Sequence, residues 1–86
     1  MEFRTFLVVS KLGINRQSIV ISISEIISEG LKETIIERYI IDIVEFTSAE
    51  EIFKEILPRI QDLPDNYNLI VVDEYKGVYQ ANQRTL

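Results

Sequence analysis

Several short segments of this chain carry apolar side chains on both faces of an extended backbone. Phe3–Ser10 and Tyr67–Asp73 show this pattern clearly, and Tyr39–Phe46 repeats it with only Asp42 interrupting the second face. Such segments are typical of central strands in a sheet that is covered on both sides. We therefore predict three buried strands in these ranges.

The segment Asn15–Glu29 fits two periodicities at once. Its apolar residues follow the 3.6-residue spacing of a helix, Asn15 suits an N-cap, and Gly30 suits the C-terminal end. Ile19–Ser24 also alternates like a strand, and a strand there would form a hairpin with Phe3–Ser10 and move the helix to Glu25–Glu37. The matching caps favour the longer helix, and the hairpin remains the alternative.

A second helix is predicted after Ser48. Ser48 and Glu51 form a capping box, in which the hydroxyl accepts from the Glu51 amide and the carboxylate returns to Ser48. Isoleucines every four residues from Ile52 make the apolar stripe of this helix. Because Pro58 lies inside the stripe, we expect a kink or break near Leu57.

The end of the chain has the pattern of a hairpin. Gly77 permits a tight connection after Tyr67–Asp73, and Val78–Asn82 would return antiparallel as an edge strand. The predicted order is β-α-β-α-β-β in one compact domain, residues 1–86. Strands that alternate with helices indicate an α/β fold with a mostly parallel sheet.

Composition restricts the chemistry more than the pattern does. The 86 residues include no Cys, His or Trp, and the net charge is −5. Disulfides, thiol nucleophiles, the usual catalytic base and the usual zinc ligands are therefore missing. The acidic balance argues against nucleic-acid binding, which needs a basic face. We expect no enzymatic activity, no cofactor and no metal.

The 15 Ile, 7 Val and 7 Leu make up a third of the chain and indicate a dense core. The apolar run Phe6–Val9 is too short for a signal peptide or a membrane span, so we expect a cytoplasmic protein that does not enter membranes. Two helices would have to cover both apolar faces of the sheet. A face left uncovered would make self-association a requirement of the fold.

Few residues suggest a reaction. Asp73 ends the third predicted strand, where the receiver domain of response regulators carries its phosphate-accepting Asp. Holding Mg²⁺ there needs a second carboxylate at the end of the first strand, but Ser10–Leu12 supplies none. A receiver-like domain with Asp73 as phosphoacceptor is therefore the alternative function.

Two other features have structural interpretations that we favour. The loop Gly13–Asn15 would precede a helix N-terminus, a geometry that binds anions, but one Gly is far from a phosphate-binding loop. Glutamates recur every four residues at positions 25, 29, 33 and 37, which predicts a solvated helix face that could contact a basic partner.

Aromatic residues gather around the predicted hairpin. The candidate partner-binding residues are Tyr67, Tyr75, Val78 and Tyr79. Aromatic side chains are enriched at protein interfaces. Pairing of the edge strand is a natural route to a homo-oligomer.

With this element order, the chain resembles the KaiB family of thioredoxin-like circadian clock proteins over its N-terminal half. The resemblance is carried by Phe6–Val9 with Gly13, by Ser18, and by Tyr39–Glu45 with Ala49–Glu51. It implies a thioredoxin-like fold without redox activity. It also implies a non-enzymatic regulatory module that binds a clock-type ATPase or sensor kinase and self-associates. The chain departs from the family at Pro64, which lies several residues too early before the third strand.

Overall fold

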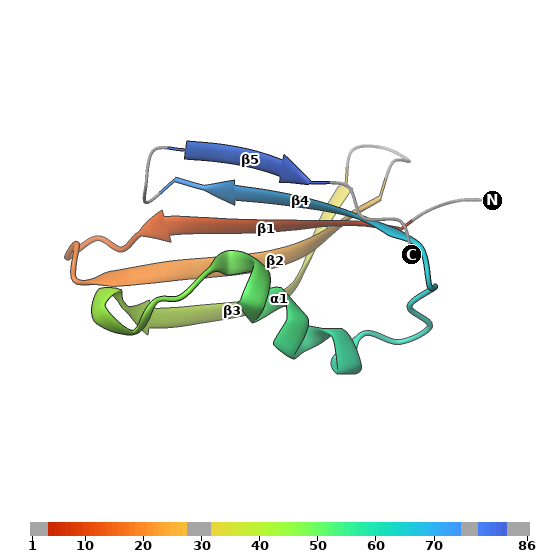
Figure 1. Cartoon of the computed structure of the whole chain (residues 1–86), viewed down its shortest axis with the longest axis horizontal. Coiled ribbons are helices and arrows are strands. Elements are labelled where there is room, and N and C mark those ends of the chain that lie inside the picture. The colour runs from red at the N-terminus through yellow and green to blue at the C-terminus, as the bar shows by residue number, and fades with distance from the viewer. Residues whose placement is uncertain (1–3, 28–31, 75–77, 83–86) are drawn as a thin grey trace.

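A computed structural model describes residues 4–27, 32–74 and 78–82 of the chain. In chain order, its elements are β1 (Arg4–Leu12), β2 (Ser18–Ile27), β3 (Lys32–Asp42), α1 (Ala49–Ile56), β4 (Tyr67–Asp73) and β5 (Val78–Asn82). Short 3₁₀ helices follow β3 at Ile43–Glu45 and α1 at Leu57–Arg59. Figure 1 shows the strands side by side, with α1 against one side of them.

The strands form one five-stranded mixed sheet in the order β3-β2-β1-β4-β5. β1, β2 and β3 are an antiparallel meander, β4 lies parallel to β1, and β5 returns antiparallel to β4. The α/β class is confirmed. The thioredoxin-like order of strands and helices is not confirmed, because a hairpin replaces the first helical crossover. Among the described strands, the parallel pair is β1–β4.

The predicted helix over Asn15–Glu29 is wrong, and so is the shifted helix over Glu25–Glu37. Within the described part of that segment, Ser18–Ile27 form strand β2, which pairs with both β1 and β3, so the hairpin alternative is confirmed. Alternate isoleucines of β2 are fully buried, and β-branched side chains suit a strand better than a helix. Asn15 does not cap a helix but shapes the hairpin turn, where its Oδ1 accepts from the Gln17 amide at 3.0 Å.

The second predicted strand, Tyr39–Phe46, lies too far along the chain. β3 covers Lys32–Asp42, and the next three residues turn away as a 3₁₀ helix. The register between β2 and β3 shifts next to Ile23, where Ile36 is an extra residue on β3. This β-bulge lets neighbouring residues of β3 contact the same side of the sheet.

Predictions made from local chemistry are confirmed over the rest of the described chain. β4 and β5 have the predicted bounds, and β5 is antiparallel as expected. The Ser48 hydroxyl accepts from the Glu51 amide at 3.1 Å, as an N-cap does. α1 ends at Ile56, and Pro58 lies in the following 3₁₀ helix, so the expected break near Leu57 is present. Gly30 and Gly77 lie outside the described residues.

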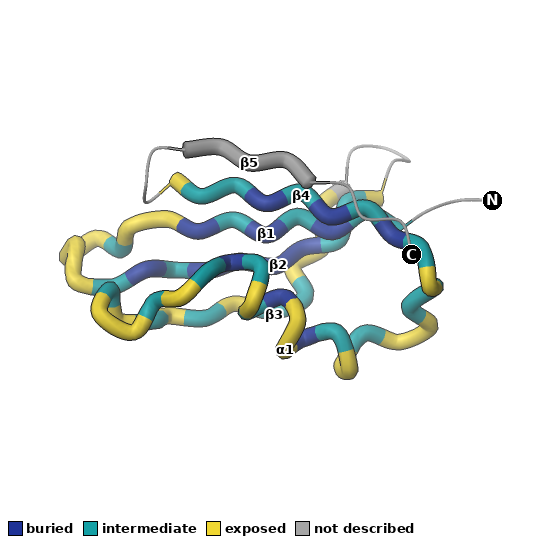
Figure 2. Tube along the Cα trace, viewed as in Figure 1, coloured by how far each residue is buried: buried dark blue, intermediate teal, exposed yellow. Residues whose placement is uncertain are grey.

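The core lies between the sheet and α1. Burial alternates along β1, β2 and β4, as Figure 2 shows, because every second side chain points toward the helix. The rings of Phe6 on β1, Phe53 on α1 and Tyr67 on β4 pack together in tilted and edge-on pairs, with centroids 5.4 to 6.1 Å apart. None of the helices in the described chain has the length and apolar character that crossing a bilayer requires.

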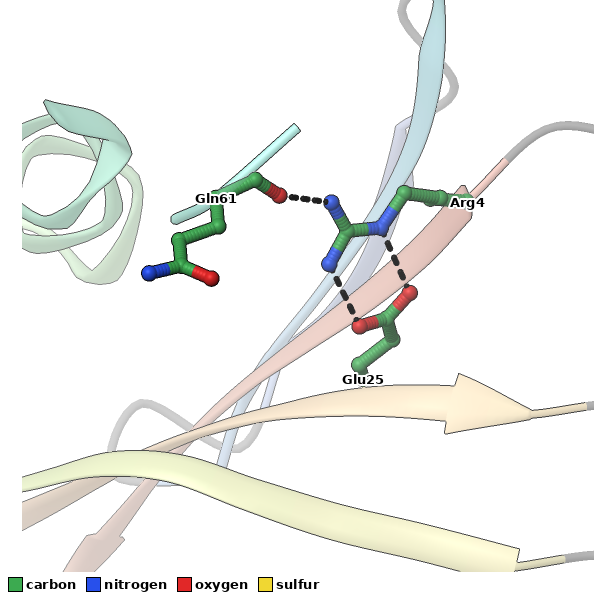
Figure 3. A network of polar contacts seen from close by, with 3 residues as sticks. All are labelled: Arg4, Glu25 and Gln61. Carbon is green, nitrogen blue, oxygen red and sulfur yellow. Dashed lines mark hydrogen bonds and ion pairs between the residues drawn. The ribbon is translucent and has the colours of Figure 1, made fainter. Parts of the chain in front are cut away.

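Arg4 fastens the connection after α1 to this side of the sheet. Its guanidinium forms two hydrogen bonds with the Glu25 carboxylate, at 2.7 and 2.8 Å, and a third with the Gln61 carbonyl at 2.6 Å (Figure 3). The hydrogen bonds from Arg4 hold the pKa of Glu25 below its ordinary value of 4.5. The pair therefore stabilises the folded chain at neutral pH.

A second ion pair anchors the other side of the same connection. Arg59, just after α1, donates to Glu37 of β3 at 3.3 Å and to the Tyr39 hydroxyl at 3.4 Å. The predicted solvated glutamate face is thus wrong for Glu25 and Glu37, which hold arginines against the sheet. Glu33 is exposed, and Glu29 lies outside the described residues. The two arginines therefore add polar contacts between the sheet and the segment that follows α1.

Candidate protein-binding face

The side of the sheet opposite α1 presents apolar side chains to solvent. We call it the open face, and the side against α1 the covered face. On the covered face, Phe6, Val8 and Leu69 are at most 1% exposed, whereas Ile35 and Ile40 on the open face are 50% and 74% exposed. The apolar residues of the open face are Leu7, Val9, Val20, Ile26, Ile35, Ile40, Ile70 and Val72, placed by strand alternation and register.

These residues form rows across the strands. One row runs from Ile35 on β3 through Ser24 and Leu7 to Ile70 on β4. The next row holds Arg38, Ser22, Val9 and Val72 in the same strand order. Apolar side chains therefore lie next to one another on β1 and β4 in both rows, and serines on β2 separate them from Ile35 and Arg38 on β3. Contiguous patches of this kind mark interaction sites on proteins.

Small side chains on β2 make a furrow in the open face. Ser22 and Ser24 occupy the central positions of β2, between the larger side chains of β1 and β3. A depression of about 410 Å³ lies over this furrow, with Leu7, Val9 and Ile35 among its lining residues. Ser24 is buried beneath its neighbours, and its hydroxyl lies 3.5 Å from the Leu7 carbonyl.

Charged residues of both signs surround the depression. Lys11 and Arg38 supply two cations, and Glu33 and Glu74 supply two carboxylates. The four charges that line the depression therefore sum to zero, although the whole chain carries −5. Lys11 on β1 lies close to Glu74, the residue after β4, since the Glu74 amide donates to the Ser10 carbonyl at 2.9 Å.

The open face continues onto the β1–β2 turn. A second depression of about 430 Å³ is lined there by Gly13, Ile14, Asn15, Ser18, Val20 and Ile40. The loop Gly13–Asn15 connects two strands, so the helix N-terminus on which an anion site would depend is not there. A Cβ at Gly13 would lie 2.5 Å from the Ser18 Oγ, which explains the glycine by close packing.

Asp73 lies at the end of β4, as predicted, and accepts from the Ser10 hydroxyl at 3.1 Å. Ser10 is fully buried and pairs with Asp73 across the parallel strands. The β1 residue opposite Asp73 is therefore a serine, not the second carboxylate that a receiver-like magnesium site needs. Within the described residues, His, Cys, Asp and Glu side chains do not gather in threes to hold a metal ion. Phosphoacceptance by Asp73 stays a prediction.

The predicted tyrosine cluster is divided by the fold. Tyr67 is only 6% exposed and packs edge-on against Phe6, which indicates a core role for its ring. Val78 and Tyr79 pair through their backbones with Asp73 and Val72. Tyr75 lies outside the described residues. Partner binding by this cluster stays a prediction.

The open face is not among the binding sites predicted from the sequence. Its signal was present in the apolar residues on both faces of Phe3–Ser10 and Tyr67–Asp73. Apolar residues on both faces predict strands that are covered on both sides. In the described residues β2 takes the place of the first predicted helix, α1 covers one face, and the other is an uncovered apolar face of the kind that would make self-association a requirement of the fold.

No family model, curated protein or solved structure matches the chain in comparisons with known proteins. Function therefore has to be inferred from the geometry of the chain itself.

Proposed function

We propose that the chain is a non-enzymatic module that works by binding protein on the open face of its sheet. The observation that carries the proposal is the group of apolar side chains on the open face, with Ile35 and Ile40 at 50% and 74% exposure. Removing such a surface from water is favourable in proportion to its area. A second protein layer against the sheet would remove it.

The chemistry of the surface favours protein over other ligands. Its two cations are balanced by two carboxylates, whereas a nucleic acid requires an excess of positive charge. Small-molecule sites are concave and enclose most of the ligand's surface. The depression around Ser22 instead lies on a broad sheet face and is lined by apolar side chains of three strands together with charged residues. This arrangement matches the anatomy of protein interfaces.

The resemblance to the KaiB family stays a hypothesis beside this proposal. It implies a regulatory role with a clock-type ATPase or sensor kinase as partner. Its thioredoxin-like order included a helix over Asn15–Glu29, which is strand β2 in this chain. The open face supports protein binding without depending on that family.

Site-specific photo-cross-linking in cells tests the proposal. A photoreactive amino acid replaces Arg38, which is exposed at the rim of the open face, and in a matched control it replaces Lys54, which is exposed on α1. We expect cross-links to a protein, identified by mass spectrometry, from position 38 but not from position 54. Equal cross-linking from both positions, or none from position 38, would show that the open face does not bind protein.

A further inference from the structure

We propose that the occupant of the open face is a second copy of this chain, which packs sheet against sheet around a two-fold axis. This inference rests on the proposed function and names its partner. The axis runs along the strands between β1 and β2, so that β1 of each copy lies over β2 of the other. Aligned sheets pack in this way with their layers about 10 Å apart.

The shape of the open face is self-complementary about this axis. Leu7 and Val9 form a ridge on β1, and Ser22 and Ser24 form the furrow on β2 beside it. The two-fold rotation keeps the rows and exchanges the two strands, so each ridge enters the partner's furrow. A two-fold interface repeats every such contact, so one ridge and one furrow per chain are sufficient.

The charges at the rim support the same arrangement. Arg38 on β3 would face the end of the partner's β4, where Glu74 lies one row away. Within one chain, β3 and β4 are separated by β2 and β1, about 14 Å at ordinary strand spacing. The rotation therefore brings opposite charges together that one chain keeps apart. Because the rim is neutral, the face itself does not add to the repulsion between two acidic chains.

The area is sufficient for a specific interface. Four strands about 4.8 Å apart and four rows about 6.7 Å apart cover about 500 Å² of the open face. Two copies would then bury about 1,000 Å², which is the lower bound for a specific protein interface. An interface of this size is expected to have a Kd in the micromolar range.

Light scattering during size-exclusion chromatography tests the assembly. At about 100 µM, above the Kd expected for this area, we expect a mass close to twice 10.0 kDa. Val9→Glu places a charge in the middle of the interface and should leave only the 10.0 kDa species. Thr47→Glu adds the same charge at an exposed loop position and should stay dimeric.

A charge exchange keeps the inference testable if Val9→Glu fails to fold. Arg38→Glu and Glu74→Arg change exposed residues, and each alone places like charges together twice in its homodimer. We expect each single variant to weaken dimerisation about tenfold, as charge pairs at interfaces do. In an equimolar mixture the two pairs are attractive again, so a heterodimer should form with nearly the wild-type Kd.

A wild-type chain that stays at 10.0 kDa, or a mixture that forms no heterodimer, would overturn the two-fold dimer. Cross-links from position 38 to peptides of this same chain support it. Cross-links to a different protein would overturn the second copy as occupant while leaving the proposed function in place. Absence of cross-links would reject both.

Discussion

The same substitution at two neighbouring residues of β1 should change the stability of the fold by different amounts, because the two side chains point to opposite faces of the sheet. Val8 points to the covered face and is fully buried, whereas Val9 points to the open face and is partly exposed. Val8→Ala and Val9→Ala remove the same two methyl groups from the same strand. Differences in intrinsic strand preference therefore cancel, and the comparison isolates the covering of each face.

The expected magnitudes follow from burial. Removing two buried methyl groups at Val8 costs about 1.6 kcal/mol in transfer free energy. The cavity left beneath α1 adds a further term, so we expect Val8→Ala to lower the free energy of unfolding by about 2 to 3 kcal/mol. At Val9 the space opens to solvent and no closed cavity forms, so the loss should be about 1 kcal/mol or less.

Urea unfolding followed by far-ultraviolet circular dichroism measures both values. The protein concentration is kept low enough for the wild-type chain to be monomeric, because dimerisation adds concentration-dependent stability. The slopes of the unfolding free energy against urea should agree between the variants, which shows that the unfolded states are comparable.

Losses of unfolding free energy that agree within about 0.5 kcal/mol at the two positions would refute this reasoning, because a difference of that size lies inside the error of such measurements. Such a result would mean that another part of the chain covers the open face. The proposals for protein binding and for dimerisation would then lose their structural basis.

Three further predictions concern local features. Glu25→Gln should lower the free energy of unfolding by about 1 kcal/mol at pH 7. Because Arg4 lowers the pKa of Glu25, this difference is complete above pH 4.5 and is lost as the pH falls through the lower folded pKa. Urea unfolding at several pH values checks it. Ser48→Ala removes the N-cap of α1 and should cost about 1 kcal/mol in the same assay, whereas Ser48→Asp should keep most of the stability. Gly13→Ala should lower the free energy of unfolding by about 1 kcal/mol, because the new Cβ would contact the Ser18 Oγ. Adding Ser18→Ala should recover part of this loss, and a double variant whose effects are purely additive would contradict this explanation.

Elements defined by local chemistry were predictable from the sequence. The capping box at Ser48 and the proline at position 58 determine where α1 begins and ends, because a cap and a missing amide act within one turn. The apolar run Tyr67–Asp73 was placed correctly, because its composition and flanking turn residues leave little choice.

The candidate site was not predictable to the same degree. In β2, isoleucines at positions 19, 23 and 26 match a helix, while those at 19, 21 and 23 match a strand. Hydrogen bonding with the two neighbouring strands, β1 and β3, settles the choice, and the spacing of apolar residues within the segment alone does not reveal that pairing. The location of the open face depends on that choice, because one helix fewer leaves one sheet face without cover.

By itself, the sequence determined that this chain builds apolar strands, ends them at particular turns and lacks Cys and His. These properties depend on residue type and short spacing. Only the tertiary structure decided which side of the sheet receives α1. Phe53 of α1 packs against Phe6 of β1, Arg4 donates to the Gln61 carbonyl, and Arg59 pairs with Glu37; each of these contacts joins residues at least 20 positions apart. Among the described residues, no helix covers the opposite face in this way.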